Sequence, residues 1–330
     1  MREDQLPSVT VLMPAYNYGG YIGRAIQSVL DQDYPARLLR LVVVDDGSTD
    51  DTAAVVERFA AANAERIVFI RQANSGPSAA INRALAEATG ELVAVLDADD
   101  IWLPEKTRRQ AELLATDPAL GLVFCDMRVV DGSERLVRPS QVGQIGAFPR
   151  RAFARLLCQN VVTQSSLMIR RQLAKPIPPG VPYSDWWFAI CASSVSELLY
   201  IPEQLALYRE HGANLTSGVS GAAGVREHRK EIDFQLWALR NVDLSALTPD
   251  EARLVWNGVE YHARALHAAA GSLFARLADV DDSDRERARQ LDAAAAAAGS
   301  REAEVTLALQ GLGWDPYDFE LRMRVLADRN

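Results

Sequence analysis

Lysine is nearly absent from this sequence. The only three are Lys106, Lys175 and Lys230, and with 44 acidic residues against 35 basic ones the formal net charge is −9. The arginines are scattered and form no basic run. Because nucleic-acid binding depends on a concentrated cationic surface that displaces counterions from phosphates, we expect no nucleic-acid partner.

Cysteine is also scarce. Cys125, Cys158 and Cys191 are odd in number, far apart in the sequence and surrounded by apolar residues. This pattern argues against a disulfide framework and against a zinc site, and it indicates buried thiols in a reducing compartment.

Long hydrophobic runs are missing as well. Val9–Met13 is too short for the core of a signal peptide and is followed by Pro14, and no stretch approaches about 18 uninterrupted apolar residues. We therefore expect no transmembrane segment and a cytoplasmic chain, peripheral to a membrane at most.

The residues that are present have the composition of a globular protein. Hydrophobic residues make up 48% of the 330 residues and charged residues 24%, which does not indicate disorder. A chain of this length can form one large domain and a smaller one.

The first half of the chain alternates short apolar runs with helical patterns. This alternation predicts βαβ units and a mostly parallel sheet flanked by helices, the α/β class. The runs are continuously apolar, which is typical of strands covered on both faces. The expected strands are Val9–Met13, Leu41–Val44, Arg66–Ile70, Glu91–Leu96 and Leu120–Cys125.

The pattern changes in the second half. It is looser from about Ser133 to Asn160, and Gly212–Gly224 is typical of a loop or linker. Between them we expect a strand at Ser165–Ile169, a proline-rich turn at Pro176–Pro182, a helix near Asp185–Ala192 and strands around Glu197–Tyr208.

Residues 221–330 predict a C-terminal helical subdomain. Thr248-Pro249-Asp250-Glu251 combines a capping threonine, a first-turn proline and a glutamate that reaches back. An apolar stripe with helical spacing follows, which fits an intramolecular core and leaves a homodimer through these helices open. Its members are Val255, Val259, His262, Leu266, Leu273 and Leu277.

Polar groups follow the carboxyl ends of the first four expected strands, where open α/β sheets bind their ligands. Singly, each has a structural explanation as a turn, a helix cap or a packing residue. Their convergence at one edge of the sheet predicts a ligand site. The groups are Pro14-Ala15-Tyr16-Asn17, Asp45-Asp46-Gly47-Ser48-Thr49-Asp50, Asn74-Ser75-Gly76 and Asp97-Ala98-Asp99-Asp100.

Two common phosphate-binding patterns are absent from these groups. Gly19, Gly20 and Gly23 do not form G-x-G-x-x-G, and no G-x-x-x-x-G-K-[ST] occurs, which excludes the dinucleotide fingerprint and the P-loop. An edge built from carboxylates needs a divalent cation between itself and a phosphate. Asp97 and Asp99 offer hard oxygen ligands suited to Mg²⁺ or Mn²⁺.

Residues 8–211 resemble the inverting family 2 glycosyltransferases, whose nucleotide-binding domain has the Rossmann-like GT-A fold. The resemblance rests on the four polar groups and on Trp102-Leu103-Pro104, which follows the Asp97-x-Asp99 (DXD) motif. It implies a GT-A domain over residues 1–220, with a nucleotide-sugar half at about 8–130 and an acceptor half at about 131–220.

The resemblance also implies roles for the matching residues. Tyr16 would lie against the base, Asp46 with Asp45 would bind the base or ribose, Asp97 would face the ribose or donor sugar, and Asp99 would bind the metal. The implied donor-binding set is Pro14, Tyr16, Asn17, Asp45, Asp46, Asn74, Gly76, Asp97, Ala98 and Arg209.

Two later segments complete the resemblance. Tyr183-Ser184-Asp185-Trp186-Trp187 is similar to the segment that carries the catalytic base, so Asp185 would be the base, with Ser184 in place of the usual glutamate. Tyr208-Arg209-Glu210-His211 is similar to a motif that helps to hold the diphosphate or the metal, which implies His211 as a metal ligand. Ala80-Ile81-Asn82 lacks an arginine that is frequent in the family, so a phosphate or acceptor contact from that helix loses its support.

These features predict a metal-dependent glycosyltransferase that moves a sugar, with inversion, from a nucleoside-diphosphate sugar to an unidentified acceptor. The motifs do not separate uridine, thymidine and guanosine donors, although the resemblance favours a UDP-sugar. The acceptor classes left open are a glycan, a lipid-linked sugar, a peptide and a natural product. One alternative is a non-catalytic nucleotide-sugar-binding protein, disfavoured because Asp99 and Asp185 are both present. The other is a sugar-nucleotidyl transferase, disfavoured because Pro14–Gly20 contains no basic residue to hold a triphosphate.

Overall fold

The computed structural model describes residues 1–143 and 148–211, and residues 230–255 except 232, 236, 240, 249 and 253. The chain divides into two compact units, one of residues 1–152 and 160–211 and the other of residues 153–159 and 212–330. All of the predicted site residues belong to the first unit.

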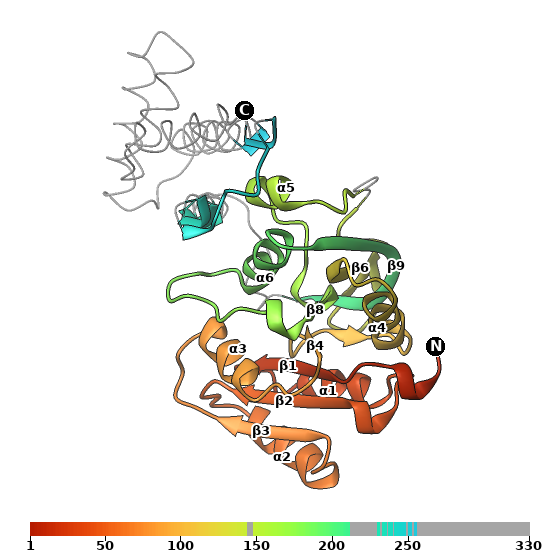
Figure 1. The fold of residues 1–330 in the computed structure, drawn as a ribbon. Helices are drawn as coiled ribbons and strands as arrows, with labels where there is room; N and C mark the ends of the chain where they lie inside the picture. The colour runs from red at the N-terminus through yellow and green to blue at the C-terminus, as the bar shows by residue number, and fades with distance from the viewer. Residues whose placement is uncertain are drawn as a thin grey trace, which may run out of the picture. The chain divides into compact units, whose positions relative to one another are not determined.

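The described strands of the first unit form one sheet in the order β3-β2-β1-β4-β8-β6-β9-β5, with β7 paired to β6 (Figure 1). The first four strands in this order run parallel, and β8 lies antiparallel between β4 and β6. β6 and β9 then pair in parallel, which confirms the predicted α/β fold with a mostly parallel sheet. The strands are β1 (Val9–Ala15), β2 (Leu39–Asp45), β3 (Ile67–Arg71), β4 (Leu92–Val95), β5 (Ile101–Trp102), β6 (Leu120–Asp131), β7 (Leu136–Arg138), β8 (Leu167–Arg170) and β9 (Glu197–Glu210).

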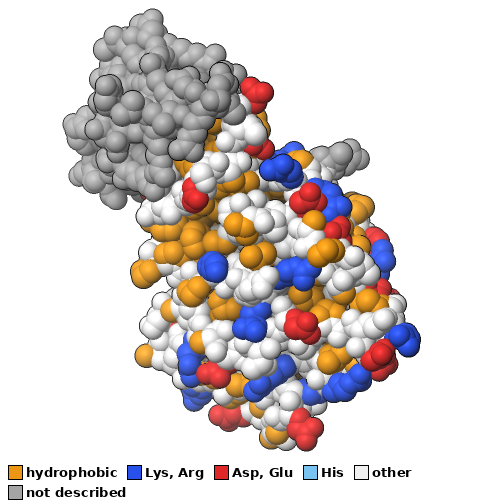
Figure 2. All heavy atoms as spheres, viewed as in Figure 1, with side chains coloured by type: hydrophobic (Ala, Val, Ile, Leu, Met, Phe, Trp, Pro, Cys, Tyr) orange, Lys and Arg blue, Asp and Glu red, His pale blue; other side chains and the backbone are white. Residues whose placement is uncertain are grey.

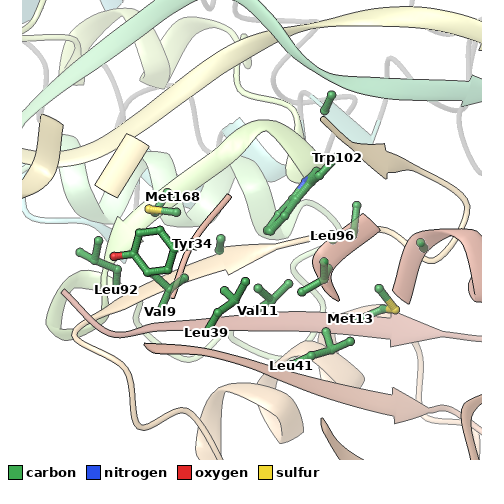
Figure 3. Packing of buried hydrophobic residues seen from close by; sticks show 14 of the residues in the cluster. Val9, Val11, Met13, Tyr34, Leu39, Leu41, Leu92, Leu96, Trp102 and Met168 are labelled. Atoms are coloured by element: carbon green, nitrogen blue, oxygen red, sulfur yellow. The ribbon is translucent and has the colours of Figure 1, made fainter. Parts of the chain in front are cut away.

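The continuous apolar runs form these strands because both faces of the sheet are buried. Every residue of β1 is buried, and those of β2 are buried except Arg40. Val9, Val11 and Met13 share one face of β1, where Leu39 and Leu41 of β2 belong to the same core cluster (Figure 3). This packing fixes the register of the strands, and with it the position at which each strand ends.

Helices connect successive strands and cover the sheet. They are α1 (Ile22–Leu30), α2 (Thr52–Ala62), α3 (Pro77–Ala86), α4 (Lys106–Thr116) and α6 (Ser184–Ser193). α3 packs on β1 and β2, α4 on β6 and β8, and α6 on β6, β8 and β9. Since helices return the chain between parallel strands, β1 to β4 all end at the same edge.

Three boundaries differ from those expected. β9 is one strand over the whole of Glu197–Glu210, and β6 continues to Asp131, where it pairs with β7. The strand expected at Ser165–Ile169 begins as a 3₁₀ turn over Gln164–Ser166. The turn forms because the amide and the hydroxyl of Ser166 both donate to the carbonyl of Thr163, which competes with ladder pairing.

The described part of the second unit consists of helical segments joined by the non-helical residues 242–248. It contains α5 (Phe153–Cys158), and residues 230–241 and 250–255 are helical at their described positions. The predicted capping box is confirmed, since Thr248 Oγ1 accepts from the amide of Glu251 at 3.3 Å and the Glu251 carboxylate accepts from the amide of Thr248 at 2.8 Å. Gly212–Gly224 and the apolar stripe beyond Val255 lie outside the described residues.

Acidic and basic side chains are interspersed over the visible face of the described chain in Figure 2. Among the described residues, no helix combines the length and the hydrophobicity that a membrane span requires.

Candidate active site

The carboxyl ends of the parallel strands bring the predicted polar groups together at one edge. Ala15, Asp45 and Arg71 lie side by side in the register of β1, β2 and β3. Pro14 is buried within β1 and pairs with Val44, whereas Tyr16, just beyond the strand, is 45% exposed. Of these two predicted nucleotide contacts, only Tyr16 therefore has a ring that is accessible to a ligand.

Asn17 links the first two strand ends. It has a left-handed backbone with φ 58°, which asparagine tolerates better than most residues. Its amide donates to Ser48 Oγ at 2.9 Å, and its side-chain oxygen accepts from the amide of Thr49 at 2.8 Å. Asn17 thereby fixes the loop that carries Tyr16 against the loop that follows β2.

Asp45 is fully buried at the end of β2. Its carboxylate accepts from the amide of Ser48 at 3.0 Å and from Arg71 Nε at 3.1 Å. Arg71 was not among the predicted site residues, although an arginine that ends an apolar strand is a signal that could have identified it. Its side chain is half-exposed, so it adds a cation to an otherwise acidic edge.

Asp46 organises the loop that follows β3. Its carboxylate accepts from Gln72 Nε2 at 2.7 Å, from the amide of Ser75 at 2.9 Å and from the amide of Gly76 at 2.8 Å. Three donors from one loop explain why Asn74 and Gly76 take up defined positions beside β2. The predicted contact of Asp46 with the base or ribose stays a prediction.

The acidic turn after β4, Asp97–Asp100, concentrates three carboxylates. Asp99 and Asp100 are 6% and 2% exposed, and Asp97 is half-buried. Burial raises the pKa of all three carboxyl groups, and the charge of Asp99 raises those of Asp97 and Asp100 further. Ala98 packs into the core cluster, so its side chain helps to place the turn.

Neighbouring elements hold this turn with polar groups. The amide of Asp97 donates to Ser165 Oγ at 3.0 Å, and Gln164 Nε2 donates to the Asp97 carboxylate. The amide of Arg209 in β9 donates to Asp100 Oδ1 at 2.9 Å. The sequence did not indicate Gln164 or Ser165, because their contacts depend on how β8 is placed beside β4.

Asp99 and His211 form the candidate metal site. Asp99 Oδ2 and His211 Nε2 lie 3.1 Å apart, and the Tyr18 hydroxyl also hydrogen-bonds the Asp99 carboxylate. The His211 ring stacks on Tyr21 with ring centroids 4.7 Å apart, which fixes its orientation. Among the described residues, no group of three or more His, Cys, Asp or Glu side chains is arranged to hold a metal ion, so this candidate site has two protein ligands.

Arg209 is buried and directed inward. Its Nε donates to the carbonyl oxygen of Asp99 at 2.8 Å, and its other nitrogens reach the carbonyl of Gly132 and the carboxylate of Glu134. These contacts tie β9 to the acidic turn. The donor contact predicted for Arg209 stays a prediction, and the bonds described give it a positioning role.

Asp185, the predicted base, lies in the first turn of α6. Its carboxylate accepts from the amide of Trp186 at 2.6 Å and is hydrogen-bonded by the side chain of Asn160. Burial raises the pKa of Asp185 to about 6, although these two hydrogen bonds lower it. The Asp185 charge in turn raises the pKa of Asp97, so the predicted base and the acidic turn belong to one electrostatic site.

The family model described as glycosyl transferase family 2 matches residues 10–177. An uncharacterized glycosyltransferase of Nostoc sp. is 31% identical over 238 residues, which cover 69% of this chain and 72% of that protein. The chain belongs to glycosyl transferase family 2.

This family 2 glycosyltransferase is similar to further proteins. The putative teichuronic acid biosynthesis glycosyltransferase TuaG of Bacillus subtilis is 38% identical over 108 residues, 33% of this chain and 42% of that protein. Mannosyltransferase PcManGT from Pyrobaculum calidifontis matches 98% of this chain and 85% of its own, with TM-score 0.59 and 24% identity. S. aureus TarS 1-349 matches 97% and 90%, with TM-score 0.64 and 19% identity. At these identities the solved structures establish the fold, and they confirm the GT-A architecture.

Gly76 offers a test of how the loop after β3 is held. It has φ 88° and ψ 163°, a conformation that essentially only glycine adopts, and a Cβ at this position would meet no atom within 4 Å. We expect Gly76→Ala to lower the free energy of unfolding by about 1–3 kcal/mol through backbone strain alone.

The matched control for this variant is Gly20→Ala, because a Cβ at Gly20 also meets no atom within 4 Å and the backbone there is not left-handed. Chemical denaturation should show a change within about 0.5 kcal/mol for the control. Equal losses in the two variants would show that the conformation of Gly76 does not constrain the loop.

Proposed function

We propose that this glycosyltransferase transfers a sugar from a nucleoside-diphosphate sugar to a hydroxyl acceptor by a single metal-assisted displacement with inversion. The observation that carries the proposal is the common site formed by Asp99 with His211 and by Asp185. Asp99 and His211 suit the binding of a cation with a diphosphate, and Asp185 suits the removal of a proton from an acceptor.

The edge formed by β1, β2 and β3 supports nucleotide binding. Tyr16 offers an exposed ring for a base, and Asp45 with Arg71 offers a carboxylate and a guanidinium beside it. The solved relatives are complexes of PcManGT with GDP-Man and Mn²⁺ and of TarS with UDP-GlcNAc. We favour a UDP-sugar for this chain and retain a GDP-sugar as the competing donor.

The residues present fit a divalent cation. Asp99 is a buried carboxylate whose pKa is raised by burial, so a bound cation would stabilise its ionised form. A carboxylate and an imidazole are only two protein ligands, which matches ions such as Mg²⁺ or Mn²⁺ that complete their coordination with substrate phosphates. When bound, such an ion supplies Lewis-acid stabilisation of the departing diphosphate.

Asp185 performs the acid–base step in this proposal. Its carboxylate accepts the proton of the acceptor hydroxyl while the acceptor oxygen forms a bond to the anomeric carbon. The bond from that carbon to the diphosphate oxygen breaks, and its electron pair leaves with the nucleoside diphosphate. One displacement inverts the anomeric carbon, so an α-linked donor gives a β-glycoside.

The proposal also covers the domain organisation, and for the acceptor it names only chemical classes. We assign the donor half to residues 8–130, the acceptor half to 131–220 and a helical subdomain to 221–330. The acceptor is a glycan, a lipid-linked sugar, a peptide or a natural product. A homodimer through the C-terminal helices and peripheral association with a membrane stay open options beside a monomer with an intramolecular helical core.

Metal dependence is tested by thermal unfolding of the full chain with UDP or GDP, each with Mn²⁺, Mg²⁺ or EDTA. A ligand that binds only the native state adds about 2.7 kcal/mol at a hundredfold excess over its Kd. We expect a rise in Tm with one diphosphate that requires the cation and disappears in Asp99→Asn.

Asp126→Asn is the control for that experiment. Asp126 is a similarly buried carboxylate of the same unit, and it accepts from the amides of Met127, Gln141 and Val142. The control should lose stability and keep the metal-dependent rise. A full rise in EDTA, or in Asp99→Asn, would contradict the metal role of Asp99.

Asp185→Asn tests the base. We expect turnover to fall about 10²–10⁴-fold, because a general base contributes an acceleration of this size, with the affinity for the nucleoside diphosphate unchanged. Steady-state kinetics and nucleotide titration measure the two quantities.

The pH profile provides a second measurement. The pKa of Asp185 is about 6, so the carboxylate is protonated below that pH and cannot accept a proton. We expect kcat/KM of the wild type to fall about tenfold per pH unit below pH 6 and to level off above about pH 7. An Asp185→Asn variant with wild-type turnover would remove Asp185 from the mechanism. An acidic limb that persists in this variant would be assigned to Asp97, whose pKa burial raises to about 7.

A further inference from the structure

The short segment Asn160–Ser166 contacts both the acidic turn after β4 and the predicted base. The Asn160 side chain hydrogen-bonds the carboxylate of Asp185. Ser165 Oγ accepts from the amide of Asp97 and also hydrogen-bonds the Asp100 carboxylate. A segment with no assigned role therefore holds the acidic turn and the predicted base together.

Gln164 is the central residue of this segment. Its Nε2 donates to the Asp97 carboxylate, and its Oε1 accepts from Ser184 Oγ. An amide has donors on one side and an acceptor on the other, so this arrangement fixes which end faces which partner. Gln164 thus joins the acidic turn after β4 directly to the first residue of α6.

Ser184 transmits this link to the predicted base. It begins α6 and precedes Asp185, whose carboxylate is held by the amide of Trp186 in the same turn. A movement of Ser184 therefore moves the turn that carries Asp185. Two hydrogen bonds therefore connect Asp97 through Gln164 to Ser184, the residue that precedes the predicted base.

We propose that Gln164 is a positioning residue that holds Asp185 at the reacting distance from the sugar donor bound at the acidic turn. The inference rests on the proposed function, since it needs both a donor at Asp97 and a base at Asp185. Gln164 contacts other protein groups and is not itself a catalytic residue. A misplacement of reacting groups by about 1 Å can lower a rate about 10²-fold, so a positioning residue has a measurable effect.

The test compares Gln164→Leu with Gln32→Leu in the full chain. Gln32 is a buried glutamine of the same unit that also joins two elements: its Nε2 donates to the carbonyl of Leu103, and its Oε1 accepts from Thr107. It has no contact with the acidic turn or with α6 among its described hydrogen bonds. Three quantities are measured for each variant. They are Tm, the Kd for UDP or GDP with Mn²⁺, and the rate at which UDP-N-acetylglucosamine or GDP-mannose is hydrolysed to UDP or GDP with water as acceptor.

We expect the Kd of Gln164→Leu for UDP or GDP to stay within twofold of the wild-type value. We expect this variant to hydrolyse the nucleotide sugar about 10–100-fold more slowly. Gln32→Leu should lower Tm and leave both other quantities unchanged at a temperature where it is folded. Ser184→Ala should reduce turnover in the same direction, and the double variant Gln164→Leu/Ser184→Ala should be no slower than Gln164→Leu alone, since both remove one link.

Two results would overturn the inference and leave the proposed function intact. One is turnover of Gln164→Leu equal to that of Gln32→Leu. The other is a loss of diphosphate affinity as large as the loss of turnover, which would place Gln164 in donor binding. A wild type that binds neither UDP nor GDP with Mn²⁺ would contradict the donor choice made in the proposed function, and this inference with it.

Discussion

The crowding of Asp97, Asp99 and Asp100 at the end of β4 is the constraint on which the site depends. Buried carboxylates repel one another and lose their hydration, and the raised pKa values of these three groups express that strain. The fold supplies hydrogen bonds from Gln164, Ser165 and the amide of Arg209 to hold the turn. In the proposed function, a divalent cation at Asp99 would complete the compensation.

Much of this arrangement could be predicted from the sequence, because a buried parallel sheet produces a simple sequence pattern. Its strands are continuous apolar runs such as Leu41–Val44, and the polar residues that follow them must gather at one edge. The family resemblance is confirmed by the family model and the Nostoc sp. relative. The roles that it implies for the DXD motif and for Asp185 stay predictions. The prediction of the fold succeeded because strand ends follow directly from the apolar pattern, whereas the roles of the residues at those ends stay predictions.

It did not reach contacts between segments that are distant in the sequence. Arg71 meets Asp45 through the register of β2 and β3, and Gln164 meets Asp97 because β8 lies antiparallel beside β4. Neither register is encoded in a local pattern. The internal contacts of Arg209 were likewise not foreseeable, since the motif that contains it does not show which way a side chain of β9 points.

The central claim is that Asp99 and His211 hold a divalent cation against the diphosphate of the donor. Anomalous X-ray diffraction from crystals of the full chain grown with Mn²⁺ and UDP or GDP tests it most directly. The account predicts an Mn²⁺ peak bonded to the Asp99 carboxylate and to His211 Nε2 and in contact with the diphosphate. An ordered nucleotide whose diphosphate lies away from Asp99, or Mn²⁺ bound only elsewhere, would contradict it.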